Sequence, residues 1–371
     1  MKFVDAHTHL ELLSIHSPEL VRARSVAEVQ NLVKTLKSPT VLWGWREENL
    51  GTPLRREHID PFPLPLLLLR IDCHVGVLNR AMEEFLSLKP SPFFDPEKGY
   101  LYEKALWEAV DKLKPKGRKL EASLRRALRR AVSLRLVEVH DFVDAELARI
   151  YLRMGDELPL RVVLMPYYED YREICSLLRG RSRGRITLGW VKVFVDGSLS
   201  ARTAYLKEPY ADRAGWRGIL LRSSREIEQM IYELEDAGLR ISLHAIGDAA
   251  LEECLRAFEA VSPRLPYHRI EHAELITEEQ ALRVRDLRLL LSLQPGFRPY
   301  FRRTYLKALG AVRTRRALPL RLLDRLGVDM IFGSDMLPFN PLYGFRYAVR
   351  LLGRKKAEYY YGGWRHERRY L

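Results

Sequence analysis

Residues 223–248 have the sequence SSREIEQMIYELEDAGLRISLHAIGD, and this stretch predicts one helix followed by one buried strand. Ser223 and Glu226 are spaced as a capping box, in which two side chains satisfy backbone amides at the start of a helix. Apolar residues then recur at helical spacing, namely Ile227, Met230, Ile231 and Leu234. The apolar run Leu239–Leu243 predicts a buried strand that carries His244 at its carboxyl end.

The same alternation continues along the chain, and each later strand is followed by a polar residue. The strands predicted at Arg269–Glu271, Leu289–Leu293 and Val328–Phe332 precede His272, Gln294 and Asp335, respectively. Six earlier strands are expected at Phe3–Ala6, Val41–Trp45, Leu66–Leu69, Leu136–Val139, Leu160–Met165 and Val191–Val195. Strands that alternate with helices are typical of a parallel sheet. The sequence therefore predicts an α/β fold, a TIM (β/α)₈ barrel, with at least one strand outside the ring of eight.

The barrel is expected to occupy residues 1–345. Between about residues 89 and 130 the alternation gives way to Pro-rich and then Lys/Arg-rich sequence, which indicates an insertion of helices and loops. Residues 346–371 form a basic tail rich in aromatic residues, in which Glu358–Gly362 is expected to be a strand.

The composition bounds the class of protein. The 371 residues are 47% hydrophobic, so the chain can bury a large core and is neither disordered nor fibrous. It has no apolar run of the roughly 18 residues that cross a bilayer and no signal-peptide pattern, so we expect a cytoplasmic protein without a membrane partner. Cys73, Cys175 and Cys254 are scattered and odd in number, which argues against a disulfide framework.

His7 and His9 are two residues apart on a predicted strand, so both side chains point to one face and can hold a single ion. Alone, such a pair is more often two polar loop residues. Its context changes this, because His244, His272 and Asp335 each follow a later strand and lie at the rim where barrels carry their chemistry. Imidazole and carboxylate ligands together suit zinc, iron or manganese better than calcium or magnesium. We therefore expect one or two divalent metal ions, with zinc preferred.

Lys192 lies inside the apolar strand Val191–Val195, where a bare ammonium would be costly to bury. Two interpretations are open. The side chain can reach solvent or Asp196 along its aliphatic stem. Alternatively, its neutral amine reacts with carbon dioxide to form a carbamate that bridges two metals.

Nine segments occur in order along about residues 3–345: Val4–His9, Trp43–Trp45, Arg70–His74 with Asn79, Val139–Asp141, Val191–Ser198, His244–Asp248, Arg269–His272, Gln294–Pro295 and Gly333–Asp335. Together they resemble the amidohydrolase superfamily, specifically its amidohydrolase 3 (YtcJ-like) branch. The resemblance implies a metal-dependent hydrolase barrel that acts on a small molecule. Members of this branch usually carry a β-sandwich beside the barrel. Because His7 and His9 lie close to Met1, we expect this sandwich to be reduced or absent, without its N-terminal part.

The resemblance also assigns roles to residues. His7 and His9 would bind the more buried metal, Lys192 would be the bridging carboxylated lysine, and His244 and His272 would bind the second metal. Asp335 would contact the first metal and shuttle protons, although an Asp after a strand is often only a helix cap. Arg70 and His74 either bind substrate or brace their loop, and Gln294 is a candidate substrate-binding residue.

The predicted function is hydrolysis of amide or formamide carbon–nitrogen bonds other than peptide bonds, by a metal-activated hydroxide. The alternative is a catalytically idle barrel whose basic tail binds nucleic acid or a protein partner. Lys and Arg exceed Asp and Glu by 62 − 48 = 14. The tail mixes aromatic residues with arginine, namely Tyr359, Tyr360, Tyr361, Trp364, Arg365, Arg368, Arg369 and Tyr370. Packing of these aromatics against the barrel is the preferred account, so nucleic acid is disfavoured as a partner. A homo-oligomer is left open.

Overall fold

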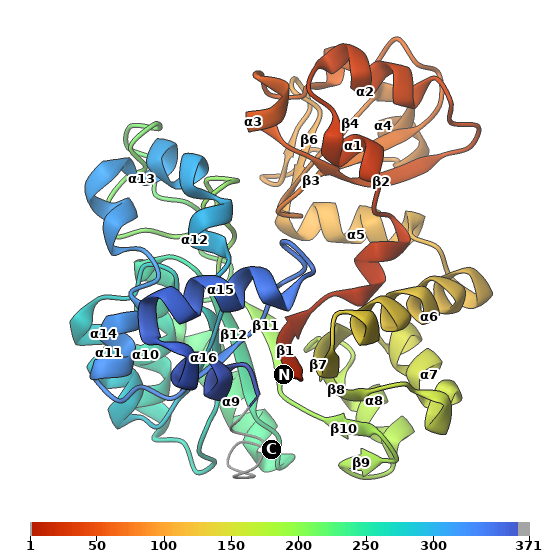
Figure 1. Ribbon diagram of the computed structural model, residues 1–371. Helices are drawn as coiled ribbons and strands as arrows, with labels where there is room; N and C mark the ends of the chain where they lie inside the picture. Colours follow the sequence, from red (N-terminus) through yellow and green to blue (C-terminus); the bar gives the residue numbers. More distant parts are fainter. Residues whose placement is uncertain (1, 363–371) are drawn as a thin grey trace. The chain divides into compact units, whose positions relative to one another are not determined.

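The computed structural model describes residues 2–362 of the chain, which divides into two compact units (Figure 1). The large unit comprises Met1–Leu10 and Glu121–Leu371, and the small unit comprises Glu11–Leu120. Both units mix helices with β-sheet, so the fold is mixed α/β. The boundary at residues 120 and 121 falls inside helix α6 (Gly117–Ser133).

The large unit contains two five-stranded sheets. The first has the order β1 (Phe3–Thr8), β7 (Leu136–Val143), β8 (Arg161–Pro166), β10 (Ile186–Leu188) and β9 (Ser182–Arg183). The second has the order β11 (Val191–Phe194), β12 (Ile241–Ala245), β13 (Arg269–His272), β14 (Leu290–Leu293) and β15 (Met330–Phe332). All neighbouring strands are parallel except β9 and β10. Parallel pairing brings the carboxyl ends of neighbouring strands to the same edge.

Two contacts join these sheets. After β8, Tyr167 forms an isolated parallel bridge with Lys192 of β11. At the other end, β15 contacts β1, and the backbone N–H of Asp335 donates to the carbonyl of His7 at 2.9 Å. Gly333 permits this approach, because a Cβ atom there would lie 2.6 Å from the His7 nitrogen. The first strand of the chain is thus held next to the last.

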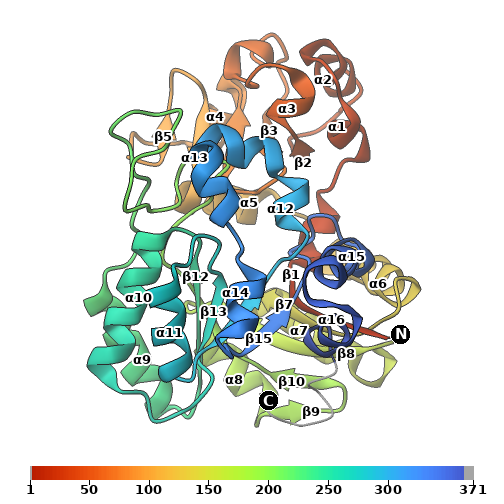
Figure 2. The same cartoon turned by 60° about the vertical axis from the view of Figure 1, so that its left-hand side comes forward.

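Helices follow most of these strands. They are α7 (Ala145–Met154), η3 (Gly155–Glu157), α8 (Tyr171–Leu178), α9 (Ser224–Asp236), α10 (Asp248–Val261), α11 (Glu278–Asp286), α12 (Phe297–Tyr300), α13 (Arg302–Arg316), α14 (Leu320–Arg325), α15 (Pro341–Leu352) and α16 (Arg354–Tyr360). Figure 2 shows α9, α10 and α11 beside one another along the second sheet. The predicted capping box of Ser223 and Glu226 is present at the start of α9. A second box, Thr277 and Gln280, starts α11.

Of the eleven strands expected from the sequence, ten are overlapped by an observed strand. Eight lie in the large unit, whereas Val41–Trp45 and Leu66–Leu69 correspond to β2 and β3 of the small unit. Two of the predicted strands therefore belong to the sheet of the small unit, and the ring of eight itself stays a prediction. The strand expected at Glu358–Gly362 was wrong, because helix α16 occupies most of that segment. The division into residues 1–345 and a tail stays a prediction.

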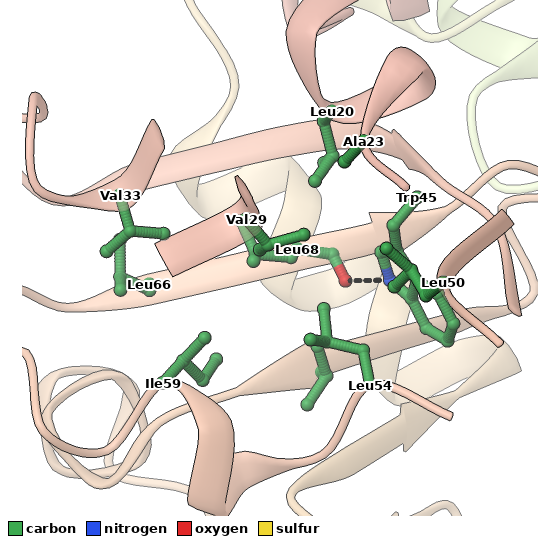
Figure 3. Packing of buried hydrophobic residues seen from close by; sticks show 11 residues of the cluster. Leu20, Ala23, Val29, Val33, Trp45, Leu50, Leu54, Ile59, Leu66 and Leu68 are labelled. Carbon is green, nitrogen blue, oxygen red and sulfur yellow. Dashed lines mark hydrogen bonds between the residues drawn. The ribbon is translucent and has the colours of Figure 1, made fainter. Parts of the chain in front are cut away.

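The small unit has a five-stranded sheet in the order β2 (Thr40–Trp45), β3 (Leu66–Arg70), β4 (Val75–Leu78), β6 (Tyr100–Tyr102) and β5 (Phe94–Asp95). Only β2 and β3 are parallel. Its other elements are η1 (Leu10–Ser14), α1 (Pro18–Arg22), α2 (Val26–Val33), α3 (Glu47–Leu50), η2 (Arg56–His58), α4 (Arg80–Leu86) and α5 (Glu103–Leu113). Figure 3 shows its core, where Val29 and Leu68 are fully buried and the Trp45 indole donates to the Leu68 carbonyl at 2.9 Å. Within residues 2–362, no helix is long and apolar enough to cross a membrane.

We expect Leu68→Ala to destabilise the small unit, because it leaves a cavity in a core of buried apolar side chains. The free energy of unfolding should fall by about 2–5 kcal/mol, measured by urea denaturation followed by circular dichroism. Phe85→Ala in α4 is the control, because the Phe85 side chain is 56% exposed. It should change the stability by less than about 0.5 kcal/mol. Equal effects of the two changes would contradict this account of the core.

Candidate metal centre

Three side chains converge where β1 ends beside β15. Ligand atoms of His7, His9 and Asp335 all lie within 4.8 Å of one another. The Asp335 Oδ1 atom is 3.3 Å from His7 Nε2 and 3.5 Å from His9 Nε2. His7 is buried, whereas His9 and Asp335 are partly exposed. The predicted His7, His9 and Asp335 cluster is therefore present as a group of one carboxylate and two imidazoles.

Two further histidines continue this group along the second sheet. The His272 ring centroid is 4.8 Å from that of His7 and 4.5 Å from that of His244. Neighbouring strands explain the second distance, because His244 of β12 is paired with Glu271 of β13, directly before His272. The structure thus places His244 next to His272 and His272 next to His7.

The backbone is strained at two of these positions. His272 has φ = 72° and Asp335 has φ = 50°, both in the left-handed region that non-glycine residues rarely adopt. Ala273 and Met336, which follow them, also have positive φ. Such conformations cost about 1–3 kcal/mol each and cluster at functional sites. The strain supports a functional role for both side chains.

Hydrogen bonds orient three of the imidazoles. His7 donates from Nδ1 to a carboxylate oxygen of Glu271 at 2.7 Å, and His272 donates from Nδ1 to the Gln294 amide oxygen at 2.8 Å. His244 donates from Nε2 to the Gly197 carbonyl at 3.2 Å. Because a neutral imidazole has one donor and one acceptor nitrogen, the lone pairs lie on His7 Nε2, His272 Nε2 and His244 Nδ1.

Lys192 is buried at 1% exposure, so the interpretation in which its side chain reaches solvent was wrong. Its Nζ atom has no hydrogen-bond partner within residues 2–362. It lies instead 4.2 Å from the ring centroid of Phe142 and 4.8 Å from that of Phe194. Burial lowers the pKa of Lys192 to about 8, although the carboxylates of Glu271 and Asp335 act in the opposite direction. The amine is therefore far easier to deprotonate than an exposed lysine.

The protonation states of the imidazoles suit metal binding. Burial lowers the pKa of His7 and of His272 well below the usual value, and the charge of Lys192 lowers both further. Neutral imidazoles carry the lone pairs that a metal needs. His7 Nε2 also has no hydrogen-bond partner in the described part of the chain. Unsatisfied buried donor atoms, neutral imidazoles and a carboxylate together fit a divalent ion of the zinc, iron or manganese type.

The other predicted site residues fall into two groups. Gln294 is fully buried, and its amide nitrogen donates to the Ser292 carbonyl at 3.3 Å, so both ends of its amide are engaged. Arg70 and His74 belong to the small unit. There the Arg70 guanidinium makes a two-point ion pair with Asp72, at 2.7 and 3.0 Å.

His74 is also paired within the small unit. Its Nδ1 lies 2.8 Å from a carboxylate oxygen of Glu103, and both residues are buried. The second carboxylate oxygen of Glu103 has no hydrogen-bond partner among the described residues. This turn between β3 and β4 thus holds a polar cluster of its own.

Sequence reasoning missed three residues beside the centre. Glu271 braces His7, the Tyr167 hydroxyl lies 3.4 Å from His9 Nδ1, and the Phe142 ring stacks 4.9 Å from that of His9. Glu271 had a visible signal, since it directly precedes His272 at the end of a predicted strand. Tyr167 and Phe142 had none, because their roles depend only on which strands are neighbours.

The sequence matches the amidohydrolase family over residues 3–369. The chain belongs to the amidohydrolase family. It is 27% identical to the putative amidohydrolase YtcJ of Bacillus subtilis over 387 aligned residues, which cover 94% of this chain and 72% of the relative. The YtcJ-like branch predicted from the nine segments is therefore confirmed.

Two solved structures resemble the chain over almost its whole length. An uncharacterized metal-dependent hydrolase from Pyrococcus horikoshii OT3 is 29% identical with a TM-score of 0.80, and the match covers 98% of this chain and 80% of that one. Another from Pyrococcus furiosus is 30% identical with a TM-score of 0.75, over 97% and 80% of the two chains. Membership of the amidohydrolase family supports a hydrolase and implies a divalent metal.

We expect Lys192→Met to stabilise the chelator-treated protein at pH 7, because it removes a buried amine that has no hydrogen-bond partner. The gain in the free energy of unfolding should be about 1–3 kcal/mol, measured by urea denaturation. Lys355→Met is the matched control, because Lys355 is exposed, and it should change little. A loss of stability in Lys192→Met would show that this lysine supports the fold.

Proposed function

We propose that the chain is a metal-dependent hydrolase that cleaves amide or formamide carbon–nitrogen bonds other than peptide bonds. The observation that carries the proposal is the convergence of His7, His9 and Asp335, with His244 and His272 continuing the same group. Amidohydrolase membership and the two metal-dependent hydrolase structures support the reaction class. The substrate would be a small molecule.

The same proposal includes a (β/α)₈ barrel. The eight strands would follow one another as β1, β7, β8, β11, β12, β13, β14 and β15. The bridge between Tyr167 and Lys192 and the contact of β15 with β1 support closure of this ring. Asp335 and the four histidines would then lie at the carboxyl ends of the strands, where barrel enzymes carry their active sites.

Six side chains would hold the metal: His7, His9, Lys192, His244, His272 and Asp335. Zinc fits this ligand set, with iron and manganese as alternatives, and the distribution of ligands suits two ions. When bound, the metal lowers the pKa of a water ligand and polarises the carbonyl of the substrate. For Lys192 to take part, its neutral amine must react with carbon dioxide, which forms a carbamate and releases one proton. Its burial favours that neutral amine.

Asp335 is the proposed proton carrier. Its carboxylate is partly exposed and lies within 3.5 Å of both histidines of β1. It would take a proton from the attacking water and deliver it to the departing nitrogen, as a general base and then a general acid. The φ of 50° places the Asp335 backbone in the left-handed region, which a continuing strand does not use.

The proposed substrate-binding residues differ in support. A substrate-binding role for Arg70 and His74 remains a proposal. Both residues belong to the polar cluster of the small unit. Gln294 is better assigned to positioning, because it is fully buried and its amide oxygen accepts from His272. It would fix the orientation of the His272 ring.

The alternative function through the basic tail has less support. Tyr361 is buried, and Tyr360 donates to Asp324 at 2.9 Å and packs against Phe332. These contacts favour packing over the stacking of bases. Trp364, Arg365, Arg368, Arg369 and Tyr370 lie outside the described residues.

Metal content measured by plasma mass spectrometry tests the centre, on protein purified without chelator or affinity metal. We expect close to two equivalents in the wild type and less in His7→Ala and Lys192→Ala, because each change removes a proposed ligand. His58→Ala and Lys355→Ala are the controls and should retain the wild-type content. One equivalent that survives Lys192→Ala would exclude the bridging role. A protein that binds no metal after reconstitution would exclude the hydrolase proposal.

Turnover of a panel of amides and formamides tests Asp335. We expect Asp335→Asn to lower kcat by about 10²- to 10⁴-fold, since an amide cannot accept the proton. Asp286→Asn on the exposed surface is the control and should leave kcat unchanged. Metal content is measured on the same samples, so that loss of metal and loss of proton transfer can be separated. An active Asp335→Asn enzyme would exclude the proton role.

A further inference from the structure

A chain of buried polar side chains runs behind His7 in the large unit. Glu271 is fully buried and accepts from His7 Nδ1 at 2.7 Å, from the Ser242 hydroxyl at 2.5 Å and from Arg269 Nη2 at 3.0 Å. The Arg269 Nε atom forms an ion pair with the other Glu271 oxygen at 2.5 Å. Arg269 and Glu271 are two residues apart on β13, so their side chains share one face of the strand.

Arg269 is the centre of this chain and is also fully buried. Its Nη2 donates to the Ser292 hydroxyl at 2.7 Å and to the Ala6 carbonyl. Its Nη1 lies 3.0 Å from His140 Nδ1, and its guanidinium carbon is 5.4 Å from the Trp190 ring centroid. One arginine of β13 therefore contacts β1, β7 and β14 at once.

The direction of each hydrogen bond follows from the chemistry of Arg269. A guanidinium has donors and no acceptor, so His140 Nδ1 must accept from it. The proton of a neutral His140 then lies on Nε2, which is 3.4 Å from a Glu138 oxygen. On the other side, an ionised Glu271 can only accept, so His7 must donate from Nδ1. Arg269 therefore determines which ring nitrogen carries the proton in both His140 and His7.

We infer that Arg269 is a positioning residue of the metal centre, because by holding Glu271 it makes His7 present its Nε2 lone pair to the site. The inference rests on the metal-binding role proposed for His7. Partners of this kind change metal affinity by about 10- to 100-fold when they are removed. A role in the fold alone is the competing account, although a buried ion pair adds little stability compared with apolar residues of similar volume.

Two identical substitutions distinguish these accounts. Glu271→Gln and Glu138→Gln both change a buried carboxylate of the same chain of side chains into an amide, but only Glu271 contacts His7. In Glu271, one oxygen contacts His7 Nδ1 and Arg269 Nη2, and the other contacts the Ser242 hydroxyl and Arg269 Nε. An amide has a single oxygen, so these two sets of donors would compete for it. The probe is zinc alone, and the dissociation constant is measured on the full chain by competition with a chromophoric chelator. We expect about 10- to 100-fold weaker binding for Glu271→Gln and less than about threefold for Glu138→Gln.

A second readout reports the proton itself. Nitrogen-15 chemical shifts of the His7 ring, identified by their loss in His7→Gln, show which nitrogen is protonated in the zinc-free protein. We expect the Nδ1–H form in the wild type and in Glu138→Gln, and a mixture of both forms in Glu271→Gln. A loss of general stability would not produce this shift.

Arg269→Lys tests the same inference if Glu271→Gln does not fold. Lysine keeps the charge, but its three donors on one nitrogen cannot replace the fork that reaches Glu271, Ser292 and Ala6 together. We expect zinc binding to weaken and the His7 ring to show both forms. The double variant Arg269→Met/Glu271→Gln removes both charges, so no buried charge is left without its partner. It should fold and bind zinc as weakly as Glu271→Gln.

Three outcomes separate the possibilities. Equal weakening by Glu138→Gln and Glu271→Gln would overturn the inference and indicate a role in the fold alone. Unchanged zinc affinity and unchanged His7 protonation in Glu271→Gln would also overturn it, while zinc binding by the wild type would leave the proposed function standing. A wild-type protein that binds no zinc, iron or manganese would overturn the proposed function and the inference together.

Discussion

The hydrogen bonds that join β1 to β13 and β15 are the interactions on which the candidate centre depends. Asp5 accepts from the backbone N–H and the hydroxyl of Ser334, at 2.7 and 2.5 Å, and His7 donates to Glu271. Ser334 and Glu271 are separated from these partners by 329 and 264 positions in the sequence. Without these bonds, the two histidines at the start of the chain would have no fixed relation to Asp335 and His272. The absence of a side chain at Gly333 makes the approach physically possible.

The candidate metal centre lowers the stability of the large unit. It buries the Lys192 amine and the His7 Nε2 atom without hydrogen-bond partners in residues 2–362, and it holds His272 and Asp335 at positive φ. Each of these features destabilises a protein that has no ligand. The core of the small unit shows the opposite pattern, since Leu66 and Leu68 are packed among apolar side chains and the Trp45 indole has its acceptor. The contrast separates a segment whose residues stabilise the fold from one whose residues do not.

Local patterns predicted the strands well, because a strand or a helix is specified by the spacing of apolar residues and by caps such as Ser223 and Thr277. They did not separate the small unit, because Val41–Trp45 and Leu66–Leu69 have the same apolar pattern whichever sheet they join. The strand predicted at Glu358–Gly362 failed for a related reason. Its aromatic residues suit a strand, but they also suit a helix that buries Ala357 and is followed by a buried Tyr361.

The sequence by itself determined the types of candidate ligand and their order along the chain. His7 and His9 share a face because strands alternate, and His244, His272 and Asp335 follow strands because each helix–strand unit repeats the same local rule. Only the tertiary structure decided that Lys192 is buried between two phenylalanine rings, that Gln294 faces His272, and that Arg269 and Glu271 stand behind His7. The physical reason is that protonation and orientation depend on contacts between neighbouring strands, and the choice of neighbour is not a local property of the chain.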